Sequence, residues 1–289
     1  MTAMTLPLPA SVAARTRLLG EVIAWACPGL SVPHSTLVEA LDAAGLDPAV
    51  ARELAPRHAF ARACRVLSER RIIRPVAEDA TTIKFQFTAE SREDDRYEYT
   101  LETMLTLDKQ TGSVTCPLPG LATTAQEELD RCVAVRNGSD VTRIVQKLFE
   151  RQADLFSIRP AGGTYFVPQR HADFIDKIQD LLNRVGGRLL RFPVPAGTPE
   201  GDRSVTQAVA DGLAAVVAEH RAAVSQFGDD TRHDTLERAA EKIRSTKFKV
   251  LAYAEYLTGE KERLDSALAS AERELREKVE QIAGEAVGV

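Results

Sequence analysis

Apolar and polar residues alternate along this chain with two spacings, one typical of helices and one typical of strands. Apolar residues at steps of three and four predict a helix from Ser11 to Cys27 and another from Arg57 to Arg71, with short helices between them. Between Thr81 and Cys116 apolar residues occupy alternate positions, which predicts a three-stranded antiparallel meander. The chain is therefore expected to open with helices and to continue into β-structure.

The middle of the chain repeats this order of helices followed by strands. Helical spacing returns at Thr123, stops at Asn137-Gly138 and resumes with Ser139 as the expected N-cap. Two aromatic and β-branched runs then flank Gly162-Gly163, and this pattern predicts a β-hairpin over Leu155–Pro168 because glycine adopts the positive φ of tight turns. A further helix and strand are predicted over 171–185 and 188–194.

The last third of the chain has a different composition. A Pro- and Gly-rich linker from Phe192 to Asp202 precedes a tail rich in Ala, Glu, Arg and Leu, in which helices are predicted from Ser204 and over Thr231–Leu257. A third stretch carries a narrow apolar stripe, which a helix of the same chain or of a second subunit must cover. The single-chain interpretation is a helical bundle, and the other is a coiled coil. The stripe contains the expected oligomerisation residues Leu264, Leu268, Leu275, Val279 and Ile282, together with Ala271.

These patterns together predict an α+β, mostly helical fold. Three short helices with a basic last one, followed by strands, resemble a winged helix-turn-helix in element order, and the central helices and hairpin repeat that order. We expect winged-helix-like N-terminal and central modules with an antiparallel β-meander, then a C-terminal helical hairpin or coiled coil. The expected domains are 1–118, 119–195 and 203–289, because the prolines and glycine of Pro117–Gly120 should block regular structure.

Charge is distributed unevenly along the sequence. The net charge of −5 divides into +3 over residues 1–76, −8 over 77–130, +5 over 131–191 and −5 over 192–289. The two basic segments are available either to a polyanion or to the acidic segments of the same or another protein. Arginine strongly outnumbers lysine, and its planar guanidinium suits phosphate recognition. Biased codon usage is an alternative explanation of that excess.

The basic segments supply the residues expected to bind nucleic acid. Arginines at helical spacing can follow a sugar-phosphate backbone, and basic residues next to aromatic ones can pair with phosphates while bases stack. A solvated helix face with salt bridges is the alternative. The expected nucleic-acid-binding residues are Arg57, Arg62, Arg65, Arg70, Arg71, Arg136, Arg143, Arg159, Tyr165 and Arg170.

Motifs for catalysis or cofactor binding are absent from the sequence. There is no phosphate-binding GxxxxGK[ST], no GxSxG, no HExxH and no GxGxxG. The four cysteines are scattered without a CxxC pair, and the five histidines fall in different predicted elements. We therefore expect no enzyme activity, no cofactor and no metal site. Without a membrane-spanning run or a secretory signal pattern, the expected location is the cytoplasm.

Two functional hypotheses follow. In the first, the protein is a non-enzymatic DNA- or RNA-binding protein whose helical tail forms an oligomer or recruits a partner. In the second, it is an adaptor or assembly subunit that acts through protein-protein contacts without nucleic acid. The segmental charge favours the first hypothesis and the overall acidity favours the second.

Overall fold

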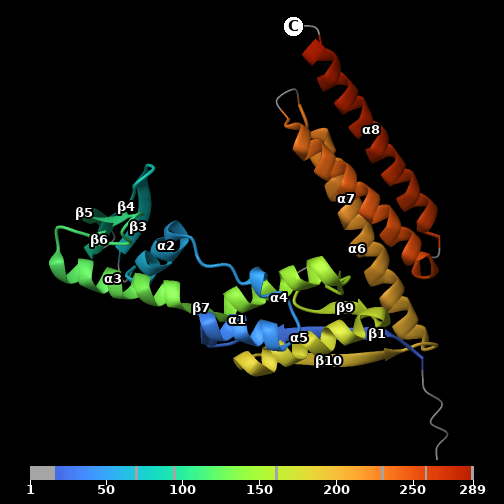
Figure 1. Ribbon diagram of the computed structural model, residues 1–289, viewed down its shortest axis with the longest axis horizontal. Coiled ribbons are helices and arrows are strands. Elements are labelled where there is room, and N and C mark those ends of the chain that lie inside the picture. The colour runs from blue at the N-terminus through green and yellow to red at the C-terminus, as the bar shows by residue number, and fades with distance from the viewer. Residues whose placement is uncertain are drawn as a thin grey trace, which may run out of the picture. The chain divides into compact units, whose positions relative to one another are not determined.

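The computed structural model describes residues 17–68, 71–93, 96–159, 162–228, 231–257 and 259–287, with the side chains of 93, 96 and 282–287 excepted. The fold is α+β with antiparallel sheets, and 56% of it is helical, which confirms the expected class. The chain forms two compact units (Figure 1). Unit 1 contains the described residues up to Trp25, 152–174 and those from Leu190 onward; unit 2 contains 26–151 and 175–189.

Unit 1 is built around a sheet whose strands come from distant parts of the chain. Its order is β10 (Arg188–Pro195), β1 (Leu18–Ala26), β9 (Tyr165–Pro168) and β8 (Phe156–Ser157). The helix expected from Ser11 to Cys27 is wrong, because its described part is strand β1; residues 11–16 lie outside the description. Val22, Ile23 and Trp25 favour a strand, and antiparallel pairing with β9 overrides the helical spacing.

The predicted hairpin is confirmed. Phe156 pairs with Phe166 across β8 and β9, and Gly162 and Gly163 have φ values of 69° and 83°. The helix and strand expected after it are α5 (Ala172–Val185), preceded by the 3₁₀ turn Gln169–His171, and β10.

The tail forms three helices rather than a hairpin. They are α6 (Pro199–Ser225), α7 (His233–Ala252), which is followed by the 3₁₀ turn Ala254–Tyr256, and α8 (Lys261–Val287). The linker is shorter than expected, since β10 continues to Pro195 and proline begins α6 at a position that needs no N–H. One hydrophobic cluster joins the three helices to Phe156 and Phe166 of the hairpin.

Unit 2 contains two pairs of helices, most of α5, a short two-stranded sheet and the β-meander. Helices α1 (His34–Ala43) and α2 (Pro56–Val66) flank the 3₁₀ turn Pro48–Val50, while α3 (Pro119–Ala134) and α4 (Gly138–Gln152) flank β7. Strand β2 (Ser31–Pro33) pairs with β7 (Val135–Asn137).

The N-cap of α4 differs from the predicted one. Asn137 Oδ1 accepts a hydrogen bond from the Asp140 N–H at 3.1 Å, and Asp140 Oδ2 accepts one from the Asn137 N–H at 3.0 Å. The prediction that Ser139 is the cap is therefore wrong, because this reciprocal pair satisfies the donors at the helix start.

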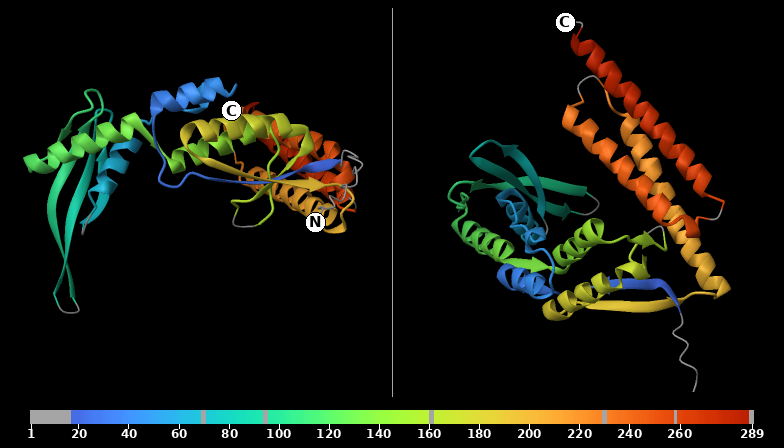
Figure 2. Two further views of the ribbon diagram at one scale, coloured as in Figure 1. Left: turned by 90° about the horizontal axis from the view of Figure 1, so that it is seen from below. Right: turned by 45° about the vertical axis from the view of Figure 1, so that its right-hand side comes forward.

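The meander of unit 2 has four strands, one more than predicted. They are β3 (Arg71–Glu78), β4 (Thr82–Glu93), β5 (Arg96–Asp108) and β6 (Val114–Thr115), in sequential order. The helix predicted to reach Arg71 ends at Val66, so Arg71 belongs to the first strand. Helices α2 and α3 cover one face, where Phe60 and Phe85 contact edge to face at 5.3 Å. Figure 2 shows the β4–β5 hairpin continuing beyond these helices.

Two sequence interpretations change as a result. Pro117–Gly120 does not interrupt regular structure, because Pro119 is the first residue of α3 and α3 packs on the meander. The N-terminal winged-helix-like order loses its first helix to strand β1. None of the helices in the described ranges has the length and apolar composition required to traverse a bilayer.

We predict that Gly138→Ala destabilises the protein by about 2 kcal/mol, because a methyl group in a packed site forces the backbone to shift. A Cβ at Gly138 would lie 2.0 Å from the carbonyl oxygen of Cys27. The matched control is Gly120→Ala, also in the first turn of a helix, where an added Cβ would have no atom from the rest of the protein within 4 Å. Urea unfolding of both variants measures the difference, and equal midpoints would contradict the steric explanation.

Candidate functional site

Most of the predicted nucleic-acid-binding arginines in unit 2 are paired with carboxylates. Arg62 donates two hydrogen bonds to Asp140, at 2.7 and 2.8 Å, and Arg71 donates two to Glu102, at 2.5 and 2.8 Å. Arg143 is exposed but lies 4.0 Å from the same Asp140. Two-pronged arginine–carboxylate pairs are strong and fix the guanidinium plane, so Arg62 and Arg71 are held in contacts within their own unit.

Arg136 is 2% exposed, and its guanidinium forms hydrogen bonds with the protein backbone. Its Nη1 donates to the carbonyl oxygens of Cys132, Val133 and Val135, which end helix α3. Burial lowers the pKa of this guanidinium. The burial of Arg136 does not support the expectation that it contacts nucleic acid, since a phosphate would need an exposed guanidinium.

The predicted residues of unit 1 also make internal contacts. Arg170 donates to Asp154 at 2.5 Å, and the Tyr165 ring stacks on Trp25 at 5.1 Å. Arg159 is exposed, and its Nε donates to the Gly162 carbonyl oxygen at 2.7 Å within the hairpin loop. Arg70 lies outside the described residues. These side chains support the hairpin more directly than they support a ligand site.

Arg57 and Arg65 are the two predicted residues that line one concave surface. We name it the α2–β3 groove, a cavity of about 700 Å³ between helix α2 and strand β3. His58 lies beside them, and all three side chains are exposed. The helical period places His58, Ala61 and Arg65 along one stripe of α2, facing the groove. Arg57, His58 and Arg65 therefore form a basic rim along the side of the groove that α2 provides.

The floor of the α2–β3 groove is apolar. Ile83 and Phe85 form its buried base, and Ile73, Pro75 and Val76 line it from β3. Arg57 contacts Glu78 at 3.2 Å at one end, where Lys109 also contacts Glu78 at 2.9 Å. Arg65 has no ion-pair partner within the described part of the chain. The groove thus combines an apolar floor with a cation whose charge is not compensated.

The other face of the meander is uncovered within the described residues, and we name it the open face. Cross-strand register places Gln86, Thr88 and Glu90 of β4 there, opposite Met104, Leu101 and Tyr99 of β5. Arg74 and Ile72 of β3 extend these rows. Tyr97, Tyr99 and Leu101 are each more than half exposed, and a shallow cavity of about 570 Å³ lies against Tyr99.

The sequence contained a signal for the open face that the strand prediction did not use. β5 carries apolar residues in both registers, since Leu105 and Leu107 point to the core while Tyr99 and Leu101 belong to the opposite face. The extra residue Glu102 forms a bulge between these two sets. A strand that is apolar on both faces indicates that both faces are to be covered.

Unit 1 holds a cluster of charged side chains that the sequence did not predict. Asp154, which is 7% exposed, accepts hydrogen bonds from Arg170 at 2.5 Å and from the Tyr253 hydroxyl at 2.7 Å. Lys249 Nζ lies 2.7 Å from its other carboxylate oxygen, and His171 Nε2 lies 3.2 Å away. Lys249 and Tyr253 lie at the C-terminal end of α7, and Arg170 and His171 lie in the 3₁₀ turn after β9. The Asp154 carboxylate therefore links these two segments to its own.

The electrostatics of this cluster indicate a structural role. Burial raises the pKa of Asp154, but hydrogen bonds from His171, Lys249, Tyr253 and Arg170 outweigh it and hold the pKa far below its usual range. Burial, together with the hydrogen bond to this carboxylate, raises the pKa of Tyr253. The carboxylate is ionised at neutral pH and its oxygens accept from several donors, so it has no proton to give to a substrate at that pH.

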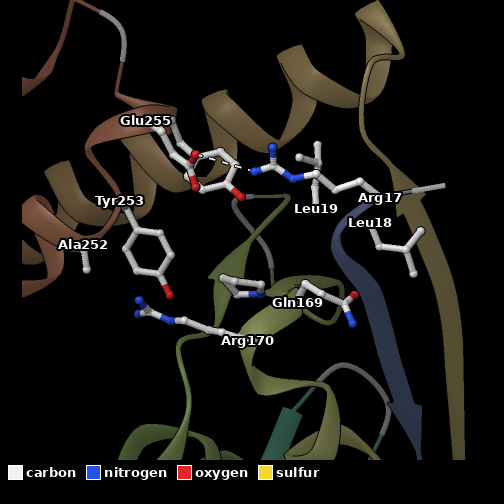
Figure 3. Close-up of a pocket in the computed structure, with 10 residues that line it drawn as sticks. Arg17, Leu18, Leu19, Gln169, Arg170, Ala252, Tyr253 and Glu255 are labelled. Atoms are coloured by element: carbon white, nitrogen blue, oxygen red, sulfur yellow. Dashed lines mark ion pairs between the residues drawn. The ribbon is translucent and has the colours of Figure 1, made fainter. Parts of the chain in front are cut away.

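A cavity of about 500 Å³ lies beside the Asp154 cluster (Figure 3). The Tyr253 hydroxyl and the Arg170 guanidinium lie next to each other at one side, with the guanidinium carbon 4.2 Å from the Tyr253 ring centre. Exposed Arg17 and Glu255 form a loose ion pair at 3.8 Å across the opposite side. The charged groups that line this cavity, Arg170, Arg17 and Glu255, are thus each engaged with another side chain of the protein.

The apolar stripe predicted for oligomerisation is largely covered by its own chain. Leu264, Leu268 and Leu275 are buried in the cluster shared by α6, α7 and α8, whereas Val279 is 37% exposed. The side chain of Ile282 is outside the description. The helical-bundle interpretation of the stripe therefore accounts for the buried part.

Groups of metal-binding residues are also missing from the described ranges: nowhere there do three His, Cys, Asp or Glu side chains lie together. The cysteines are unbonded to one another, and burial raises the pKa of Cys64 to about 12. Such a thiol stays protonated at neutral pH and is a poor nucleophile.

We predict that Asp154→Asn destabilises the protein by about 2 kcal/mol at pH 7, because the buried carboxylate loses its charged hydrogen bonds with Arg170 and Lys249, which are themselves partly exposed and therefore screened by solvent. Asp234→Asn, which removes an exposed carboxylate 2.5 Å from Arg238, should cost less than about 0.5 kcal/mol. Because the folded-state pKa of Asp154 is depressed, its contribution is fully present above the unfolded-state pKa near 4, decreases as pH falls below that value, and is lost completely only below the folded-state pKa. Thermal unfolding from pH 7 down to pH 3 should show the difference between the wild type and Asp154→Asn becoming smaller without disappearing.

Comparison with known proteins places the chain without assigning an activity. Neither the curated proteins nor the solved structures contain a match. One family model, DUF6744, described as a family of unknown function, matches residues 18–285, nearly the whole chain. The chain belongs to the DUF6744 family.

Proposed function

We propose that this protein is a non-enzymatic adaptor that binds an acidic, partly apolar segment of a protein partner in the α2–β3 groove. The observation that carries the proposal is the uncompensated Arg65 above a floor of Ile73, Val76 and Phe85. A carboxylate of the partner would pair with the guanidinium, while its apolar side chains would cover the floor. Such a ligand uses both parts of the groove.

Nucleic acid is the second candidate for the same groove. Arg57 and Arg65 lie eight residues apart on α2, close to two helical turns, and could contact successive phosphates. The helix, helix, hairpin order of α3, α4 and β8–β9 keeps the winged-helix-like interpretation of the central module within this candidate. Three points favour the protein ligand: the pairing of Arg62 and Arg71 with carboxylates, the net charge of −8 over residues 77–130, and an apolar floor that phosphates would not use.

Fluorescence anisotropy with three labelled probes tests the proposal: a short peptide of alternating Glu and Leu, a DNA single strand and a DNA duplex. We expect the peptide to bind at micromolar concentration and Arg57→Ala/Arg65→Ala to weaken binding about tenfold, which corresponds to about 1.4 kcal/mol for two cations at a partly apolar site. Arg52→Ala/Arg131→Ala removes the same charge from exposed positions outside the groove and should leave the affinity within about twofold.

The outcomes separate the two ligands. Equal losses in both double variants would reduce the peptide result to general charge attraction and overturn the proposal. Oligonucleotide binding that depends on Arg57 and Arg65 and weakens steeply with salt, without peptide binding, would replace the adaptor with the nucleic-acid candidate.

A further inference from the structure

We infer that the acidic partner segment binds as an extended strand, which pairs antiparallel with the free edge of β3. This binding mode rests on the proposed function, because it gives the backbone conformation of the ligand that the α2–β3 groove would take. The ligand is thus an acidic segment in extended conformation and not a preformed helix.

Strand β3 lies at one edge of the meander. Its only neighbour among the described strands is β4. The residues of β3 from Arg74 onward are exposed, and Val76 is 48% exposed. An exposed edge strand with apolar side chains is a template for pairing with another chain, and extended peptides bind to such edges through their backbone.

The hairpin that joins β3 to β4 shows which backbone groups of β3 point outward. At its end the Asp79 N–H donates to the Thr82 carbonyl oxygen at 3.0 Å, so Asp79 directs its backbone groups toward β4. Residues of an antiparallel strand alternate in this respect, and Val76 is the extra residue of a bulge. Counting back from Asp79 past this bulge, Pro75 and Ile73 direct their backbone groups toward the free edge.

Two further observations agree with this assignment. Pro75 has no N–H, so it fits a position from which the β3–β4 ladder takes no donor. Arg71, which has the same parity as Ile73, donates its N–H to the Ser68 carbonyl oxygen at 2.9 Å. The N–H of Arg71 is therefore directed away from β4, as the alternation requires.

The free edge offers one donor and two acceptors to a ligand. They are the Ile73 N–H and the carbonyl oxygens of Ile73 and Pro75, which form no hydrogen bond with any other described residue outside the sheet. In an antiparallel ladder, the ligand residue opposite Ile73 exchanges two hydrogen bonds with it, and the ligand residue opposite Pro75 donates one more. The backbone of the ligand is thereby fixed along β3.

The register of β3 also sets the direction of the ligand side chains. Ile73 and Pro75 pair with Phe87 and Phe85, which are buried on the face that α2 covers, and both line the α2–β3 groove. Directly opposite residues of paired strands point to the same face. The ligand residues that donate to β3 therefore direct their side chains toward α2.

These side chains meet the two chemical parts of the groove. Arg57 near the start of α2 contacts Glu78 at the end of β3 at 3.2 Å, so Arg65 near the end of α2 lies toward the beginning of β3. A carboxylate on the ligand residue opposite Ile73 would then pair with Arg65. An apolar side chain opposite Pro75 would cover the floor of the groove.

A second copy of the chain fits this edge less well than an acidic ligand. Antiparallel pairing of β3 with itself uses a two-fold axis perpendicular to the sheet, which keeps both α2 helices on one side. Their basic rims, each with the uncompensated Arg65, would then face each other and repel. An acidic strand brings the opposite charge to the same place.

Fluorescence anisotropy with backbone-methylated peptides tests the inference. The probe is a labelled peptide that repeats Glu-Thr-Leu-Thr, in which Glu and Leu would face α2 and donate their N–H groups to β3. N-methylation of the Glu and Leu residues removes these donors and should weaken binding about tenfold or more. N-methylation of the Thr residues, whose N–H groups point away from β3, should change the affinity by less than about threefold.

A pair of variants tests the same hydrogen bonds from the protein side. Ile73→Pro removes the outward N–H without removing a donor from the ladder, whereas Ile73→Ala shortens the side chain and retains the N–H. We expect the unmodified peptide to bind Ile73→Pro about fivefold more weakly than Ile73→Ala. Thermal unfolding checks that both variants are folded, and the methylated peptides probe the same bonds on the wild-type chain.

The outcomes separate this binding mode from the proposed function. Equal affinities of the two methylated peptides, while the unmodified peptide binds and depends on Arg57 and Arg65, would overturn the added strand and leave the proposed function standing. Failure of every peptide to bind, including the Glu–Leu peptide, would overturn both. A dimer of the chain alone in sedimentation equilibrium, dissociated by Ile73→Pro, would assign the edge to a second copy and overturn the inference.

Discussion

The burial of one face of the meander beneath α2 and α3 is the interaction on which both the α2–β3 groove and the open face depend. Phe60, Phe85 and Phe87 lie in that interface and fix α2 against β4. Because α2 ends at Val66 and does not extend over the edge strand, its basic side chains border a groove whose floor is the sheet. The same packing directs alternate residues to the opposite face and leaves them without cover. One hydrophobic contact therefore generates two surfaces of different chemistry.

Internal charge pairing determines which cations remain available. Arg62, Arg71 and Arg170 each contact a carboxylate of their own unit, whereas Arg65 and Arg74 contact none within the described residues. Arg62 and Arg71 therefore have a structural role, because the guanidinium forms two-pronged pairs that a lysine cannot reproduce. A segmental charge count cannot distinguish these two groups of arginines, since the distinction depends on partners far away in the sequence.

Local signals made part of the fold predictable. Glycines between alternating apolar residues predicted the hairpin of β8 and β9, and alternation in residues 81–116 predicted three of the four meander strands. Prediction failed where the deciding contact is distant. The spacing of apolar residues over Leu18–Ala26 fits a helix, but antiparallel pairing with β9 makes this segment a strand. The cluster around Asp154 could not be predicted from the sequence, because its partners include Lys249 of α7, which is far away along the chain. Of the residues that line the α2–β3 groove, the sequence predicted only Arg57 and Arg65 as binding residues. The floor of the groove comes from strands that follow α2 in the sequence, and their packing against α2 could not be predicted.

The pairing of β1 with β9 also has a consequence for synthesis on the ribosome. Gly20 meets Pro168, so 148 residues must be made before this strand finds its neighbour. At 5 to 20 residues per second, translation of that stretch takes roughly seven to thirty seconds. During this interval the backbone amides of β1 have no ladder partner from β9, while all four strands of the meander are synthesised before β9. Nascent chains of this protein therefore present an unpaired, apolar strand that chaperones would be expected to bind first.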